Sequence, residues 1–229
     1  MQGKELDEKG DEWMNEEKAI HQKLNVNWEF AKIASNAQIE RAARALEANG
    51  IKTLIAQHGE EAEQMVFDLL PEGAEVFTAS SQTLEQLGIP AALAESEEYE
   101  LVRDKLKKMD PKTQNREMVK LGATPEYVLG SVHAVTEDGQ VLVASNTGSQ
   151  LGPYAAGAAH VIWVVGAQKI VKDLEEGMRR IEEYAFPRED ERLKKAMGIS
   201  SGVNKVLMVN KEIQRGRVTM IIVKEEIGY

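Results

Sequence analysis

The sequence predicts an α/β protein with a mixed, mostly parallel sheet flanked by helices. Short apolar segments typical of buried strands alternate with longer segments whose apolar residues recur at helical spacing. Alternation of this kind favours parallel strands joined by helices that cover both faces of the sheet. Asp138-Gly139, between two strand-like segments, adds an antiparallel hairpin. The sheet is therefore expected to be mixed.

From residue 35 the first half of the chain alternates helices and strands. Apolar residues at helical spacing from Ile39 to Leu46 predict a helix that ends at Asn49-Gly50, because both residues tolerate the left-handed conformation. Pro71-Glu72-Gly73 ends a second helical pattern. The predicted elements of this half are a strand at 51–55, a helix at 60–70, a strand at 74–79 and helical segments from about 82 to 121.

The second half carries most of the predicted strands. The hairpin around Asp138-Gly139 supplies two of them, and an apolar run at 161–165 has the composition of a buried strand. The chain closes with two strands separated by residues 210–217. The predicted elements are strands at 127–129, 132–136, 140–144, 161–165, 205–209 and 218–223, and a helix at 170–185.

Residues 1–34 are expected to form a helical arm that precedes the α/β domain. Trp13, Trp28 and Phe30 lie among charged residues in an irregular helical pattern. Because such aromatic side chains need to be buried, we expect the arm to pack on the body of the protein or on a second subunit, as in a homodimer.

Composition narrows the classes of function. The 229 residues carry a formal net charge of -10, which argues against nucleic acid or an anionic membrane as a main partner. The chain has no cysteine, so it can hold neither a disulfide nor a cysteine-ligated iron–sulfur cluster, and no other cofactor is evident. The polar, acidic start lacks the features of a signal peptide, and no apolar run approaches the ~20 residues of a membrane-spanning helix. We therefore expect a cytoplasmic protein with no membrane insertion.

Polar residues follow several predicted strands, at the sheet edge where α/β proteins bind ligands. Ser80, Ser81 and Thr83 could hold a phosphate or carboxylate, or simply cap the next helix. Lys169 could place a positive charge in the crevice, or be a solvated surface lysine. The small polar run 145–150 is typical of a loop that lets a ligand approach the backbone, and equally of a surface turn.

No pattern in the sequence names a reaction. Glu137 could be a catalytic carboxylate, although the tip of a solvated hairpin would look the same. Gly148, Gly152 and Gly157 do not form a dinucleotide-binding motif or a P-loop. The histidines are widely separated and show no metal-ligand spacing, so no metal site is predicted. The sequence also shows no evident pair of a nucleophile and its general base.

The segment 131–181 resembles the LUD-domain (lactate-utilisation) family. The likeness continues upstream through Ser80–Leu84 and downstream through Glu189–Arg192, Gly202–Lys205 and Glu225–Tyr229. It covers most of the chain from about residue 35, so residues 35–229 are expected to form a LUD-like α/β domain. The resemblance implies a fold similar to that of the sugar-isomerase and coenzyme A transferase superfamily.

The best-known members of that family belong to a bacterial system that oxidises lactate to pyruvate alongside iron–sulfur subunits. The resemblance therefore implies a protein that binds a small anionic metabolite and serves as an accessory component of lactate oxidation, with iron–sulfur or redox subunits as partners. An alternative is an enzyme that acts on an acyl-CoA or phosphorylated substrate through Glu137. The residues that match by position, together with those of the polar loop, give the predicted ligand-binding set: Ser81, Thr83, Thr136, Ser145, Asn146, Gly148, Ser149, Gln150, Lys169, Arg192, Asn204 and Lys205.

Overall fold

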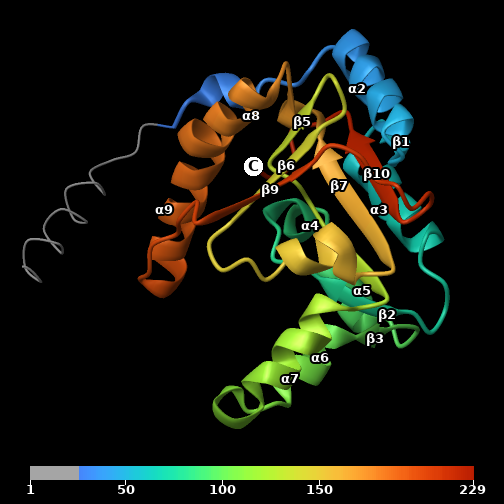
Figure 1. Cartoon of the computed structure of the whole chain (residues 1–229), viewed down its shortest axis with the longest axis vertical. Coiled ribbons are helices and arrows are strands. Elements are labelled where there is room, and N and C mark those ends of the chain that lie inside the picture. The colour runs from blue at the N-terminus through green and yellow to red at the C-terminus, as the bar shows by residue number, and fades with distance from the viewer. Residues whose placement is uncertain (1–25) are drawn as a thin grey trace, which may run out of the picture.

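A computed structural model describes residues 26–229, and its largest element is a parallel sheet of six strands (Figure 1). Every neighbouring pair in this sheet is parallel. The prediction of an α/β fold with a mostly parallel sheet is thus confirmed. In spatial order the strands are β1 (Lys52–Ala56), β10 (Val218–Val223), β7 (His160–Gly166), β4 (Tyr127–Gly130), β2 (Glu75–Thr78) and β3 (Glu100–Leu101).

The predicted hairpin belongs to a second, smaller sheet. Its turn places Gly139 at φ 77°, a left-handed value that favours glycine. The hairpin strands pair with each other and with the 205–209 strand in antiparallel fashion, and with a short parallel strand at the other side. The mixed character expected for one sheet is therefore confined to this one. Its strands in spatial order are β8 (Ile170–Val171), β5 (Ala134–Thr136), β6 (Val141–Ser145) and β9 (Lys205–Val209).

Both faces of the large sheet are buried. Along β7, Trp163 packs with one apolar cluster and Val164 with another, because successive side chains of a strand point to opposite faces. The Trp163 face meets α2 (Asn36–Ala48) and the small sheet. The Val164 face meets α3 (Gly59–Asp68), α4 (Gln82–Gln86) and α5 (Ile89–Glu95). This double burial explains why the strand reads as a continuous apolar run.

The small sheet has a helical layer of its own. Val135 and Val143 face the large sheet, whereas Leu142 packs with Ile181 and Met178 on the opposite face. Figure 1 shows the helices of residues 174–197 on that outer side of the small sheet. They are α8 (Leu174–Arg180), the π-helical turn η4 (Ile181–Ala185) and α9 (Phe186–Met197); the remaining helices are α6 (Val102–Lys107), α7 (Pro111–Ala123), the π-helical turn η2 (Pro153–Gly157) and the 3-10 turn η3 (Ala167–Lys169).

The helix expected at 170–185 is wrong at both ends. Ile170 and Val171 form β8, because they pair with β5 of the small sheet. The helix begins after Asp173, whose side chain accepts a hydrogen bond from the backbone of Glu176 at 3.0 Å, and it continues past Ala185 to Met197. A π-helical turn precedes Pro187 in the first turn of α9.

The predicted arm at 1–34 lies mostly outside the described residues. Its last part forms the 3-10 turn η1 (Trp28–Ala31) and packs on the helical layer. The backbone N–H of Asn27 donates to the Glu183 carbonyl at 2.8 Å, and Phe30 is buried as expected. The expectation is wrong for Trp28, which meets Tyr184 edge to face but remains 61% exposed. The part of the chain that the structure describes contains no helix with the length and apolarity needed to cross a bilayer.

Candidate functional site

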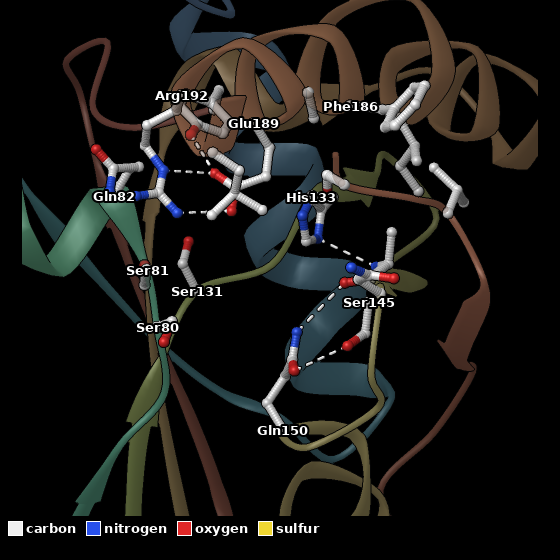
Figure 2. A pocket seen from close by; sticks show the side chains of 18 of the residues that line it. Ser80, Ser81, Gln82, Ser131, His133, Ser145, Gln150, Phe186, Glu189 and Arg192 are labelled. Carbon is white, nitrogen blue, oxygen red and sulfur yellow. Dashed lines mark hydrogen bonds and ion pairs between the residues drawn. The ribbon is translucent and has the colours of Figure 1, made fainter. Parts of the chain in front are cut away.

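A cavity of about 730 Å³ lies beyond the carboxyl ends of β2, β4 and β7. These three strands are neighbours in the large sheet, so the residues that follow them are brought together. The β6 loop and the helices η4 and α9 close the other sides. In Figure 2, Ser81 and Ser131 face Ser145 and Gln150 across this space, with Arg192 and Glu189 at its edge.

Lys169 lies at the buried side of the cavity. Lys169 is the last residue of η3, the turn that follows β7, and it is 1% exposed. Its Nζ donates to Thr83 Oγ1 at 2.9 Å and to Ser131 Oγ at 3.1 Å. Among residues 26–229 no carboxylate lies within ion-pairing distance of this amine. Burial, followed by the positive charges of Arg180 and Arg188, holds the pKa of Lys169 well below its ordinary value.

Arg180 is a second buried cation beneath the same region. Arg179 and Arg180 both lie in the last turn of α8, where positive charges complement the helix dipole. Only Arg179 is a surface residue, and it pairs with Glu183 at 2.9 Å. Arg180 is fully buried and donates to the backbone carbonyls of His133 and Gln168. Its Nη2 has no hydrogen-bond partner among the described residues. Burial lowers the pKa of Arg180 to about 9, so it keeps its charge at neutral pH.

Ser131 and His133 lie on the same side of the extended segment between β4 and β5, and both line the cavity. His133 Nδ1 accepts a hydrogen bond from the Ala144 backbone at 3.1 Å. Burial, with smaller effects from Lys169 and Arg180, lowers the pKa of His133 to about 3. The ring is therefore neutral with its proton on Nε2, so it offers a hydrogen-bond donor to the cavity.

The polar loop after β6 is fixed by its own hydrogen bonds. Ser145 Oγ accepts from the Gly148 backbone at 2.8 Å and donates to Gln150 Oε1 at 3.0 Å. From the neighbouring β9 side, Asn204 donates to Asn146 Oδ1 at 2.6 Å and Lys205 donates to the Thr147 carbonyl at 2.9 Å. The loop is thus held as a defined wall rather than as a free surface turn.

An ion pair on α9 forms the rim of the cavity. Arg192 donates to both carboxylate oxygens of Glu189, at 2.7 and 2.8 Å, and Tyr229 donates to the same carboxylate (Figure 2 shows the ion pair). Burial alone would raise the pKa of Glu189, but these hydrogen bonds outweigh it and lower that pKa. The C-terminal residue is in this way attached to α9 beside the cavity.

The helical side of the cavity is apolar, in contrast to the strand side. Figure 2 shows Phe186 at this side, away from the serines. A ligand would therefore meet hydroxyl and amide groups on one wall and hydrocarbon on the other. The apolar lining residues are Ile181, Ala185, Phe186, Leu193, Met197 and Val203.

The structure brings together most of the residues predicted to bind a ligand. Ser81, which also caps α4 by accepting from the Leu84 backbone at 3.4 Å, lines the cavity with six others. Thr83, Gly148, Asn204 and Lys205 contact lining residues instead. The predicted residues on the cavity wall are Ser81, Ser145, Asn146, Ser149, Gln150, Lys169 and Arg192.

Thr136 and Glu137 do not line the cavity. Thr136 accepts from the Gln140 backbone at 3.0 Å within the hairpin. Glu137 accepts from Arg41 Nε on α2 at 2.7 Å, and this bond lowers the pKa of its carboxyl. The hairpin tip is attached to α2, away from the strand ends, so the geometry gives no support to Glu137 as a catalytic group of this cavity.

The sequence places His133 in the site region but does not pair Ser131 with Lys169. It also does not place Glu189 and Tyr229 on the cavity wall. The available signal was position, since Ser131 directly follows β4 as Lys169 follows β7. No group of three histidine, aspartate or glutamate side chains within residues 26–229 is arranged to hold a metal ion.

Comparisons with known proteins agree with this architecture. The family model described as LUD domain matches residues 39–223. The fold is similar to that in the crystal structure of a DUF162 family protein from Deinococcus radiodurans, with a TM-score of 0.52 and 11% sequence identity, over 84% of this chain and 99% of that chain. No curated protein matches the sequence.

Proposed function

We propose that this chain, which belongs to the LUD-domain family, binds a small organic anion in the cavity. It would do so as an accessory component of the oxidation of lactate or a related organic acid. Membership supports a role related to lactate utilisation at the level of the family. The observation that carries the more specific proposal is the pair of buried basic side chains, Lys169 and Arg180, that have no carboxylate partner among the described residues.

In the described part of the chain these two basic groups form no ion pair with a carboxylate, and buried groups of this kind favour a ligand of opposite sign. Charges in a protein interior are weakly screened, so the positive potential of Arg180 and Arg188 extends to the floor of the cavity. A bound carboxylate would offset the cost of burying these groups. It would also raise the pKa of Lys169 and favour uptake of a proton by its amine. This field is local, because the chain as a whole carries a net charge of -10.

The cavity wall supplies donors for the ligand. Protonated Lys169 has a third N–H beyond the two that it gives to Thr83 and Ser131, and neutral His133 offers Nε2–H. Hydrogen bonds from such groups to a carboxylate are stronger than those between neutral groups. The oxidation itself is assigned to a redox partner, because this chain has no cysteine with which to hold an iron–sulfur cluster.

Titration calorimetry with lactate, pyruvate and inorganic phosphate tests the proposal. We expect at least one of them to bind, and Lys169→Met to weaken that binding by about 10-fold or more, the usual effect of losing a hydrogen bond to a charged group. Lys172→Met removes an exposed lysine three positions along and serves as the matched control. Absence of binding to all three compounds, or equal binding by the Lys169 variant, contradicts the proposal.

The same titrations report on the protonation of Lys169. Binding measured in buffers with different ionisation enthalpies, at several pH values below 10.5, is expected to be accompanied by proton uptake, because the anion raises the lowered pKa of the buried amine. The uptake should disappear in Lys169→Met and persist in Lys172→Met. An anion bound elsewhere on the surface would show no such difference between the two variants.

A further inference from the structure

We propose that Ser131 and Lys169 form a nucleophile and general base that cleave a small ester or thioester in this cavity, with the acyl group passing through Ser131. The proposal goes beyond anion binding, since it assigns a covalent activity to the same cavity. It rests on the distance between the two side chains, on their relative exposure and on the chemistry of the opposite wall.

The two side chains have the arrangement that an activated serine needs. Lys169 Nζ lies 3.1 Å from Ser131 Oγ, within the range for proton transfer between a nucleophile and its base. Ser131 is partly exposed and its Oγ points into the cavity in Figure 2, whereas Lys169 is only 1% exposed. A substrate in the cavity would meet the hydroxyl first.

The environment of Lys169 favours the neutral amine that a base requires. Its neighbours are hydroxyls and positive charges, with no carboxylate in ion-pairing distance in the described part of the chain. Burial and the charges of Arg180 and Arg188 lower its pKa. His133 does not compete for the Ser131 proton, because its Nδ1 already accepts from Ala144 and its Nε2 carries hydrogen.

Thr83 completes the proposed Ser131–Lys169 site as a positioning residue. Its Oγ1 accepts from Lys169 at 2.9 Å and lies 3.2 Å from Ser131 Oγ, so one hydroxyl at the start of α4 fixes the relative position of both groups. A base oriented by a third group is the general form of activated-serine sites, and lysine serves as the base in some of them.

The substrate class follows from the walls of the cavity. The apolar side formed by Phe186 and Leu193 suits the hydrocarbon of an acyl group, and the polar side suits the alcohol or thiol that leaves. The volume of about 730 Å³ lies within the usual range for a ligand much larger than a three-carbon acid. His133 Nε2–H, on the same side of the extended segment as Ser131, is the donor available to the carbonyl oxygen of the ester.

The reaction balances in two steps. Ser131 Oγ bonds to the carbonyl carbon and its proton moves to Lys169 Nζ; the bond to the leaving alcohol or thiol breaks, and that group takes the proton from Nζ. Water then attacks the acyl-serine while Lys169 accepts a proton from it and returns one to Ser131 Oγ. The acid is released and both side chains regain their starting state.

The first experiment uses the full chain with p-nitrophenyl acetate and an alkyl fluorophosphonate. The fluorophosphonate should label Ser131 as fluoride leaves, and p-nitrophenol should appear with a burst. Ser131→Ala should abolish labelling, because it removes the oxygen that is labelled. Lys169→Met should lower labelling and hydrolysis by about 100-fold or more, the usual contribution of a general base. Ser96→Ala is the control, because Ser96 is also partly exposed but lies outside the cavity lining and accepts from the Glu98 backbone. Absence of labelling, or labelling that persists in Ser131→Ala, overturns the proposal.

A second experiment needs no assumed substrate. The chain has no cysteine, so Ser131→Cys introduces a single thiol. If Lys169 is a base, it accepts the thiol proton, and iodoacetamide should alkylate this thiol at pH 7 at least about 10-fold faster than the thiol of Ser80→Cys. Adding Lys169→Met should abolish the difference. Ser80 is the more exposed position, so greater access cannot account for faster reaction at 131. Equal rates, or a fast rate that survives Lys169→Met, count against the pair.

Substitution of Thr83 separates positioning from folding. Thr83→Ser keeps the hydroxyl and should retain hydrolysis, whereas Thr83→Val, of similar volume, should lower kcat and shift the pH profile set by Lys169. Failure of all these tests with intact anion binding would remove the acyl-transfer proposal and leave the proposed function standing. Loss of Thr83→Ser activity to the level of Thr83→Val contradicts the positioning role.

Discussion

Lys169 Nζ donates to Thr83 Oγ1 at 2.9 Å across a sequence separation of 86 residues. This bond connects the turn after β7 to the helix after β2. Neither this bond nor the one to Ser131 brings a negative charge to the amine. A buried lysine without a counter-charge destabilises the folded state, so its presence at a cavity is better explained by function than by stability.

The first prediction is that Lys169→Met raises the free energy of unfolding at pH 7, by about 1–3 kcal/mol, because an apolar side chain of similar length replaces a poorly solvated amine. With the folded pKa below its ordinary value of 10.5, the unfolded chain binds more protons between the two values. Wild-type stability therefore rises with pH in that window, and the advantage of the variant should shrink towards pH 10.5. Urea unfolding of both proteins at several pH values measures this.

Exposed Lys172 supplies the control for that measurement. Lys172→Met should change the unfolding free energy by no more than about 0.5 kcal/mol, as is usual for a surface substitution. A wild-type protein as stable as Lys169→Met at pH 7 would show that the buried amine is compensated by a group that the described contacts do not include.

The second prediction concerns acid stability and His133. Its folded pKa of about 3 lies below the ordinary 6.5, so the unfolded state binds more protons between these values. The contribution of the buried neutral ring is present above pH 6.5 and is lost as pH falls towards 3. His133→Asn keeps an acceptor for the Ala144 backbone but does not titrate, so unfolding free energy should fall less steeply in this range. Exposed His58, where asparagine can also cap α3, is the control position for the same substitution.

Much of the fold could be predicted because buried strands and helices have a recognisable pattern of apolar residues in the sequence. The segments 161–165 and 218–223 are apolar except for Thr219, because both of their faces are covered. The observed strands, β7 and β10, differ from them by one residue at most at each end. Strand pairing was not predictable in the same way. Whether the hairpin joins the large sheet or forms another depends on contacts with β8 and β9, and the two residues of β8 are too few to carry a period.

The candidate site was predictable only from the rule that α/β proteins bind ligands at the carboxyl ends of their parallel strands. That rule placed Ser81 and Lys169 at one edge, and the structure puts both on the cavity wall. The environment of Lys169 could not be read from its neighbours in sequence, because its partners come from β4 and α4. Arg180 illustrates the same limit, since its position near a helix end accounts for its charge equally well whether it is exposed or buried.

The third prediction tests the support beneath the cavity wall. Buried Arg217 forms an ion pair with Glu212 at 2.8 Å and donates to the carbonyls of Pro153, Tyr154 and Ala158. The guanidinium thereby fixes η2, whose Tyr154 lines the cavity. Arg217→Lys keeps the charge but cannot serve this fan of acceptors. We expect it to lower the free energy of unfolding by about 1–3 kcal/mol, because buried carbonyls lose their donors.

Chemical denaturation of Arg217→Lys and of Arg215→Lys gives the comparison. Arg215 is exposed, so its replacement should alter stability by no more than about 0.5 kcal/mol. If the two variants are equally stable, the hydrogen bonds of Arg217 to η2 do not contribute to folding.

The fourth prediction addresses the attachment of the hairpin to α2. Gly139 and Gly73 have nearly the same left-handed φ, 77° and 79°, so alanine strains the backbone similarly at both, by about 1–2 kcal/mol. A Cβ at Gly139 would lie 2.5 Å from the Ala45 backbone, whereas one at Gly73 meets nothing within 4 Å. Gly139→Ala should therefore lower the unfolding free energy by about 1–3 kcal/mol more than Gly73→Ala, because the hairpin must move away from α2. Equal losses in thermal or urea unfolding would mean that the hairpin tip shifts freely, and that the Arg41–Glu137 contact does not hold it on the helix.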